Sequence, residues 1–181
     1  MRVVAGEFRS RKLIEVDDKK TRETRDRIKE SIFNSVQSEL YESKVLDLFS
    51  GSGSLGIEAL SRGASHCTFV DVGMAQVKTV KQNVVALDIV KRSSIVKRDY
   101  RSFLQLNQDV FDVIILDPPY DLHVIEDIVQ IIQEKKILSE NGIIICLYFK
   151  NVTLDLENFD IISYKSKNMG ITNVSFLKWG N

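Results

Sequence analysis

The tetrapeptide Asp117-Pro118-Pro119-Tyr120 carries side chains suited to chemistry on a flat ring that bears an amine. Proline fixes its own φ and has no backbone N–H, so nearby carbonyls are free to point at a ligand. The Asp117 carboxylate and a prolyl carbonyl would accept hydrogen bonds from an exocyclic NH2 group, and the Tyr120 ring would stack on the base. This pattern predicts a methyl-transfer site for a nucleobase amine, although a strand that ends in a proline-rich turn also produces it.

The elements that must position this tetrapeptide are a series of apolar strands separated by helices. Apolar runs predict strands at 44–49, 67–71, 94–99, 112–116 and 142–149, and a terminal hairpin formed by 159–166 and 173–179. Apolar residues at helical spacing predict helices over 74–87 and 125–132. A shorter helix is predicted over 57–62, where Gly63 would end it. This alternation is typical of a parallel sheet covered on both faces, with antiparallel pairing added at one edge.

Ligands of such sheets bind beyond the carboxyl ends of the strands, where four candidate groups follow four strands. They are the glycine-rich turn 50–56, Asp71, Asp99 and the tetrapeptide. Gly51 and Gly53 let the backbone approach a ligand, and the following helix offers free N–H groups to a carboxylate of S-adenosylmethionine or to a pyrophosphate. Asp71 lies 20 residues beyond Gly51 and is predicted to accept hydrogen bonds from ribose hydroxyls, and Asp99 from an adenine amine.

Other function classes fit part of this pattern. Gly51, Gly53 and Gly56 match the dinucleotide fingerprint, so a NAD-dependent oxidoreductase is one alternative. Hydride transfer does not need an amine clamp at the fourth strand, and the chain leaves little room for a substrate domain. A noncatalytic RNA-binding module on the same fold is a second alternative. An enzyme that methylates adenine or cytosine amines in nucleic acid is a third.

Composition fits one globular domain. The 181 residues are 44% hydrophobic with a formal net charge of zero. No run approaches the ~18 consecutive apolar residues of a membrane helix, and the first residues do not resemble a signal peptide, so we expect a cytoplasmic protein with no membrane contact. Cys67 and Cys146 lie in apolar runs and are expected to be buried free thiols. With His66 and His123 they show no metal-ligand spacing, so no metal is expected.

Residues 1–43 are predicted to form an N-terminal extension that faces RNA, and residues 44–181 the catalytic domain. Residues 3–5 and 12–16 predict a small hairpin, and a helix is predicted to begin near Thr24. Its apolar face would be Ile28, Ile32, Phe33, Val36 and Leu40. Residues 1–29 carry ten Lys or Arg against six Asp or Glu, which favours docking to phosphates. The candidate phosphate contacts are Arg2, Arg9, Arg11, Lys12, Arg22, Arg25 and Arg27.

Several of these motifs together resemble one family. The run 45–53 followed by the tetrapeptide resembles S-adenosylmethionine-dependent amino-methyltransferases. The runs 2–6, 22–30 and 55–64 are similar to signatures of the RsmD type of bacterial 16S ribosomal RNA guanine 2-amino methyltransferase. The likeness covers nearly the whole chain. It implies a Rossmann-like class I methyltransferase fold, an α/β structure with a mostly parallel seven-stranded sheet and an antiparallel last strand.

The resemblance also implies an activity, a partner and a set of site residues. A monomer would transfer a methyl group from S-adenosylmethionine to the 2-amino group of a guanine in small-subunit ribosomal RNA, within a ribosomal particle. The implied catalytic residues are Asp117, Pro118, Pro119 and Tyr120. The implied cofactor-binding residues are Asp47, Phe49, Ser50, Gly51, Ser52, Gly53, Asp71, Asp99 and Tyr100.

Overall fold

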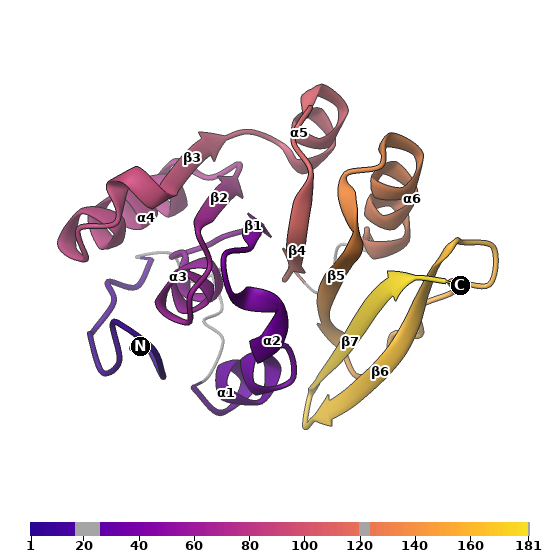
Figure 1. Cartoon of the computed structure of the whole chain (residues 1–181), viewed down its shortest axis with the longest axis horizontal. Helices are drawn as coiled ribbons and strands as arrows, with labels where there is room; N and C mark the ends of the chain where they lie inside the picture. The colour runs from indigo at the N-terminus through magenta and orange to yellow at the C-terminus, as the bar shows by residue number, and fades with distance from the viewer. Residues whose placement is uncertain (17–25, 120–123, 181) are drawn as a thin grey trace.

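A seven-stranded mixed sheet in the order β3-β2-β1-β4-β5-β7-β6 forms the centre of the computed structural model (Figure 1), which describes residues 1–16, 26–119 and 124–180. The strands are β1 (Lys44–Leu48), β2 (His66–Asp71), β3 (Ser93–Lys97), β4 (Phe111–Leu116), β5 (Leu138–Phe149), β6 (Ile161–Met169) and β7 (Thr172–Trp179). All seven predicted strands are present, with ends that differ from the prediction by a few residues.

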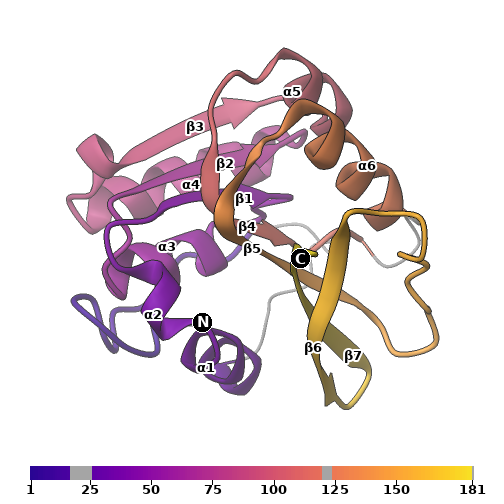
Figure 2. The ribbon, with the colours of Figure 1, turned by 45° about the vertical axis from the view of Figure 1, so that its right-hand side comes forward.

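The pairing confirms the predicted class I methyltransferase topology. Strands β3, β2, β1, β4 and β5 are parallel neighbours, and β7 runs antiparallel between β5 and β6. Figure 2 shows the β6–β7 hairpin at the end of the sheet opposite β3. Strand β5 begins at Leu138 rather than at the predicted Gly142, because Leu138 pairs with Phe111 before the register shifts.

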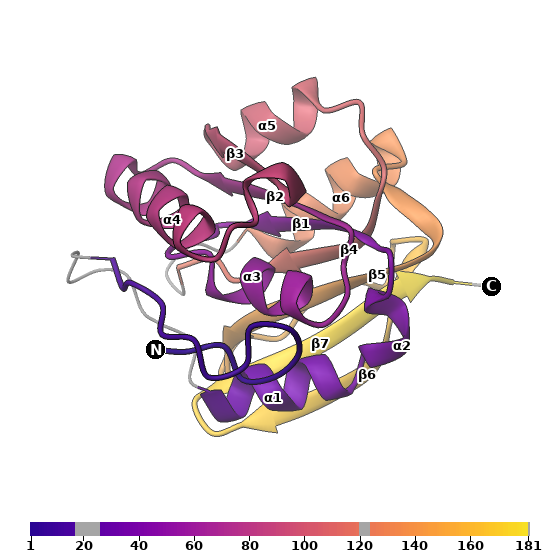
Figure 3. The same ribbon diagram turned by 60° about the vertical axis from the view of Figure 1, so that its left-hand side comes forward.

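Helices cover both faces of the sheet. They are α1 (Asp26–Asn34), α2 (Gln37–Leu40), α3 (Ser54–Ser61), α4 (Met74–Ala86), α5 (Tyr100–Leu106) and α6 (Ile125–Lys135), with a 3-10 turn at Val90–Arg92. Side chains of α1–α4 join one apolar cluster and those of α5 and α6 join another, on opposite faces of the sheet. Figure 3 shows α1–α4 on the near side. This two-sided cover explains why the strands are apolar on both faces.

The N-terminal region differs from the prediction in two ways. The expected hairpin is reduced to one antiparallel bridge between Arg2 and Lys12. The expected single helix is two helices, because the chain turns at Ser35, whose N–H donates to the Ile32 carbonyl at 2.9 Å and whose hydroxyl donates to the Ser31 carbonyl at 2.9 Å. The predicted helix start at Thr24 lies outside the described residues. The apolar positions predicted to face the sheet, Ile28, Ile32, Phe33, Val36 and Leu40, are all buried.

The first sixteen residues are here called the N-terminal arm. Hydrogen bonds from backbone N–H groups of this arm hold it against α3. Glu58 of α3 is buried and accepts hydrogen bonds from the N–H groups of Val4 at 2.8 Å and Ala5 at 3.0 Å. Gly6 has a φ of +82°, and a Cβ there would lie 1.9 Å from the Ser61 carbonyl oxygen. The arm therefore approaches α3 too closely for any residue but glycine at this point.

Both cysteines are buried and unpaired, as predicted. Within residues 1–16, 26–119 and 124–180, no group of three His, Cys, Asp or Glu side chains is placed to hold a metal ion. None of the helices in those ranges is long and apolar enough to cross a membrane.

Candidate active site at the carboxyl edge of the sheet

The pairing of β1 with β4 brings the two predicted motifs to one edge of the sheet. Leu48 pairs with Leu116 in parallel register, so Phe49 and Asp117 leave the sheet side by side. The chain continues from β1 toward β2 on one side and from β4 toward β5 on the other. Such a switch point opens a crevice beyond the carboxyl ends of the strands, where ligands of open α/β sheets bind.

The loop that follows β1 has a backbone shaped by positive φ angles. Phe49, Gly51 and Gly53 have φ values of +74°, +54° and +82°. The N–H groups of Phe49 and Ser50 both donate to the Val70 carbonyl at 3.0 Å, which ties the loop to β2. A non-glycine residue such as Phe49 in this conformation is strained, and such strain is typical of ligand-binding loops.

Asp71, at the end of β2, anchors this loop. Its Oδ2 accepts from the Gly51 N–H at 3.0 Å and its Oδ1 from the Gly73 N–H at 2.9 Å. Partial burial raises the pKa of the Asp71 carboxyl, an effect that these N–H groups oppose. Each carboxylate oxygen has two lone pairs, so a ribose hydroxyl would find a remaining acceptor here. Asp71 therefore has a structural role besides the predicted ribose contact.

Asp47 lies beneath the loop and is 1% exposed. Its Oδ2 accepts from the Gly56 N–H at 2.9 Å. A Cβ at Gly56 would lie 2.4 Å from the Phe69 ring and 2.6 Å from the Cys67 sulfur, so this glycine allows α3 to approach β2 closely. The pKa of Asp47 is raised from 3.8 to about 7, mainly by burial and also by the nearby carboxylates of Asp117 and Asp71, against the opposing effect of the Gly56 N–H.

This raised pKa predicts a pH-dependent stability. Between pH about 4 and about 7, the folded state keeps the Asp47 proton that the unfolded chain releases. The free energy of unfolding should therefore fall as the pH rises through this window, by at most about 1.4 kcal/mol per pH unit from this group. Asp47→Asn should show a flatter profile in urea titrations between pH 4 and 8. Parallel profiles for the wild type and the variant would contradict the prediction.

The start of α3 offers polar groups that fit a carboxylate-bearing ligand. Gly53 is the N-cap of this helix, and the N–H groups of a helix's first turn have no partner within the helix, although that of Gly56 donates to Asp47. The Ser54 hydroxyl is buried and has no hydrogen-bond partner among the residues that the structure describes. A buried hydroxyl without a partner is costly, and a ligand oxygen would satisfy it. These residues fit the amino acid moiety of S-adenosylmethionine.

Asp99 and Tyr100 lie beyond β3, at the start of α5. Oδ1 of Asp99 accepts from the N–H groups of Arg101 at 3.0 Å and Ser102 at 3.1 Å, so this side chain caps the helix. The Tyr100 ring packs against Phe49 at 5.5 Å between centroids, and its hydroxyl donates to Asp127 at 3.1 Å. Asp99 therefore has a structural role as the cap of α5. The contact of Asp99 with adenine stays a prediction.

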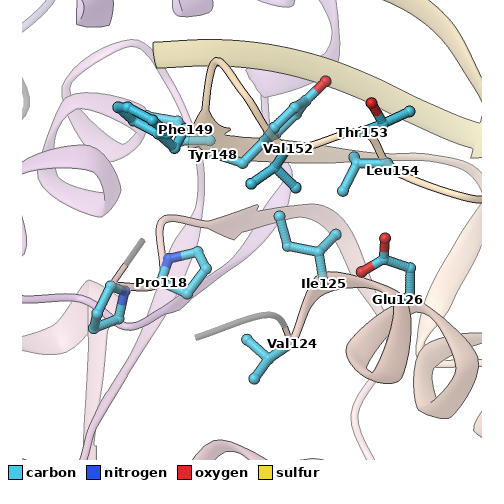
Figure 4. A pocket seen from close by; sticks show the side chains of 11 residues that line it. Pro118, Val124, Ile125, Glu126, Tyr148, Phe149, Val152, Thr153 and Leu154 are labelled. Atoms are coloured by element: carbon cyan, nitrogen blue, oxygen red, sulfur yellow. The ribbon is translucent and has the colours of Figure 1, made fainter. Parts of the chain in front are cut away.

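A cavity of about 90 Å³ opens beside the tetrapeptide. In Figure 4, Pro118, Val124 and Ile125 form one wall, and Tyr148 and Phe149 face them from the end of β5. The remaining lining residues are Pro119, Glu126, Leu147, Val152, Thr153 and Leu154. A single water needs only about 10–15 Å³, so this cavity has room for more than a water. Apolar and aromatic walls suit the faces of a planar base.

The predicted clamp residues border this cavity in part. Asp117 is half-buried, Pro118 is buried and lines the cavity, and Pro119 is exposed. Tyr120 lies outside the described residues, so its stacking role stays a prediction. The Asp117 carboxylate lies close enough to Asp47 to raise the pKa of that side chain.

The predicted RNA contacts that the structure describes lie on the N-terminal arm and α1. The side chains of Arg2, Arg9, Arg11, Lys12 and Arg27 are exposed, whereas Arg22 and Arg25 lie outside the described residues. Two of the exposed groups have partners within the protein. Arg2 pairs with Asp26 at 2.8 Å, and Arg11 donates to the Ala86 carbonyl at 3.0 Å.

The prediction missed one buried side chain that contacts the glycine loop. Asn83 of α4 is 2% exposed and donates from Nδ2 to the Ser52 carbonyl at 3.0 Å. The signal was present, because Asn83 lies within the apolar stripe of Val77, Val80, Val84 and Leu87. A polar residue in a buried stripe needs hydrogen-bond partners, which here come from the main chain.

The chain is similar to known proteins over nearly its whole length. The family model described as "Conserved hypothetical protein 95" matches residues 1–178. A Bacillus subtilis protein named "Putative rRNA methyltransferase YlbH" is 36% identical over 181 residues, which cover 98% of this chain and 98% of that protein. The "Ribosomal RNA small subunit methyltransferase D" of Haemophilus influenzae is 34% identical over 177 residues, which cover 96% of this chain and 91% of the relative.

The fold also matches a solved structure over its whole length. The crystal structure described as "putative methylase HI0767" from Haemophilus influenzae superposes with a TM-score of 0.84 and 30% sequence identity. The superposition covers 99% of this chain and 98% of that one.

Proposed function

Because the chain belongs to the family described as Conserved hypothetical protein 95, we propose that it methylates the 2-amino group of a guanine in bacterial 16S ribosomal RNA. Two relatives that are 36% and 34% identical over nearly the whole chain carry ribosomal RNA methyltransferase names, so we assign the chain to the S-adenosylmethionine-dependent methyltransferases. The oxidoreductase and the noncatalytic module are therefore not retained. The guanine, its 2-amino group and the small-subunit particle as substrate are the proposal.

The observation that carries the proposal is the parallel pairing of Leu48 with Leu116. This pair sets the start of the glycine loop next to Asp117, so a methyl donor held by the loop would lie beside an amine held by the tetrapeptide. The cavity lined by Pro118 and Phe149 borders the same edge and would receive the base. Positioning of two reactants in this way supplies much of the acceleration in transfer reactions.

The donor site would be built from the loop 49–53, Asp71 and the start of α3. S-adenosylmethionine supplies a methyl group activated by a sulfonium centre. Asp71 would bind the ribose hydroxyls, the N–H groups and hydroxyl at the start of α3 would bind the carboxylate, and Asp99 would accept from adenine. The Tyr100 ring, which packs on Phe49, would border the adenine.

The acceptor would be activated by hydrogen bonds. The lone pair of the guanine 2-amino group is conjugated with the ring, which makes the amine a poor nucleophile. The Asp117 carboxylate and the Pro118 carbonyl would accept its two N–H bonds and turn the lone pair toward the methyl group. Acceptors aimed at this nitrogen also stabilise the positive charge that it acquires during attack. The base must leave its stack to enter the cavity, which favours a target in a loop or bulge.

The proposal can be tested on small ribosomal subunits from bacteria that lack an enzyme of this family. The purified protein is incubated with tritiated S-adenosylmethionine and either intact subunits or naked 16S RNA. Digestion and mass spectrometry should then identify N2-methylguanosine, with more label in the subunits than in naked RNA. Label on adenine or cytosine, or no label in either RNA, would overturn the proposal.

A further inference from the structure

The side-chain amide of Asn83 joins two segments that are far apart in the sequence. Its Oδ1 accepts from the Ile14 N–H at 2.8 Å, and its Nδ2 donates to the Ile14 carbonyl at 3.0 Å. The same Nδ2 donates to the Ser52 carbonyl at 3.0 Å. Ile14 belongs to the N-terminal arm and Ser52 to the glycine loop, so one buried amide holds both main chains.

A second contact joins the arm to the glycine loop through Met1, which other contacts hold beside residues 13–15 of the arm. The Met1 amino group pairs with Glu15, and the Leu13 N–H donates to the Met1 carbonyl at 3.1 Å. The Met1 sulfur lies 4.0 Å from the Ser52 hydroxyl. Met1 and residues 13–15, the two ends of the N-terminal arm, therefore lie next to the loop that would hold the methyl donor.

We infer that Asn83 is a positioning residue that couples binding of the methyl donor to the order of the N-terminal arm. This inference rests on the proposed function. A donor that fixes the Ser52 carbonyl also fixes the amide that bonds it, and this amide holds Ile14 in place. Coupling free energies are reciprocal, so a ligand that orders the arm raises the affinity for the donor by the same factor.

The coupling supplies a regulatory property that the active-site residues alone would not have. The arm carries four of the predicted phosphate contacts, namely Arg2, Arg9, Arg11 and Lys12, all of which are exposed. RNA phosphates that engage these side chains would hold the arm in place. The enzyme would then bind its methyl donor more tightly when RNA is present, without any residue of the arm touching the reacting atoms.

Hydrogen exchange at the Ile14 amide tests the coupling directly. In the wild-type protein, saturating S-adenosylmethionine should slow this exchange by about tenfold, because the bond to Asn83 opens less often. Asn83→Ala should weaken donor binding, measured by calorimetry, by about tenfold, and the donor should no longer slow exchange at Ile14. Gln82→Ala, at an exposed position of the same helix, should behave as the wild type.

The outcomes separate this inference from the proposed function. If the wild type binds the donor but exchange at Ile14 is unchanged, the coupling is wrong and the proposed function stands. If the wild type binds no donor, both are wrong. The wild-type measurement needs no variant, so the inference stays testable if Asn83→Ala does not fold. Asn83→Asp keeps the acceptor for the Ile14 N–H and loses the donor to the carbonyls of Ser52 and Ile14, so it should reduce the coupling in the same direction.

Discussion

Asp117→Ala is expected to reduce the rate of methyl transfer to ribosomal RNA by on the order of 10²–10³-fold or more, while the affinity for S-adenosylmethionine changes by less than about tenfold. The variant removes the carboxylate that would orient the amine and stabilise its developing charge. The proposed donor contacts would come from the loop after β1 and from Asp71, which bonds that loop and which the substitution does not alter. Single-turnover transfer of tritium measures the rate, and calorimetry measures the binding of the donor.

Two further variants sharpen this test. Asp117→Asn keeps one oxygen acceptor and the shape of the side chain, so it should retain more activity than Asp117→Ala if hydrogen bonding to the amine matters more than negative charge. Asp109→Ala, at an exposed carboxylate before β4, should transfer methyl groups as the wild type does. Near wild-type transfer by Asp117→Ala would show that the Asp117 carboxylate is not needed to hold or activate the amine.

The sequence predicted that the glycine loop and Asp117 follow strands that end at the same edge of the sheet, as the pairing of β1 with β4 shows, because this placement depends on local patterns. Near-continuous apolar runs identified β1 and β4, and the glycines and prolines that follow them marked where each strand ends. The start of α3 was placed wrongly, at Ile57 instead of Ser54. Gly53 adopts a left-handed conformation as the N-cap, so residues that resemble a turn already form the first helical turn.

The contacts that join distant segments could not be predicted in the same way. Asn83 reaches Ile14 across 69 positions, and Val152 and Leu154 line the cavity from an irregular segment after β5. The helical spacing of α4 marks Asn83 as a buried polar residue but does not identify its partner, because that depends on how closely α4 and the N-terminal arm pack in three dimensions. For Asp99, the predicted role was a ligand contact, and the structure shows that this side chain also caps α5.

A second large effect is expected at Glu58, on the face of α3 that meets the N-terminal arm. Glu58→Ala should lower the free energy of unfolding by about 3–5 kcal/mol. The carboxylate is fully buried, accepts from Arg62 Nε at 2.9 Å and lies 3.8 Å from Lys29 Nζ. Its removal leaves two buried cations without their counter-ion, which is far more costly than the loss of a surface pair.

Urea denaturation followed by circular dichroism measures this change. Glu30→Ala removes an exposed carboxylate from α1 and should change stability by no more than about 0.5 kcal/mol. A loss below about 1 kcal/mol for Glu58→Ala would show that water or a rearranged side chain replaces the carboxylate. In that case the buried cluster would contribute little to the stability of the fold.

A triple variant separates the two roles of this carboxylate. Lys29→Met, Glu58→Met and Arg62→Met together remove all three charges and keep similar volumes, and such replacements of buried ion clusters are often neutral. The triple variant should nevertheless remain less stable than the wild type, because the N–H groups of Val4 and Ala5 lose their acceptor. Faster hydrogen exchange at these two amides would identify the remaining deficit as weaker docking of the N-terminal arm. Equal exchange would mean that the arm is held by its contacts with Ser61, in which case Glu58 serves only to neutralise the two cations.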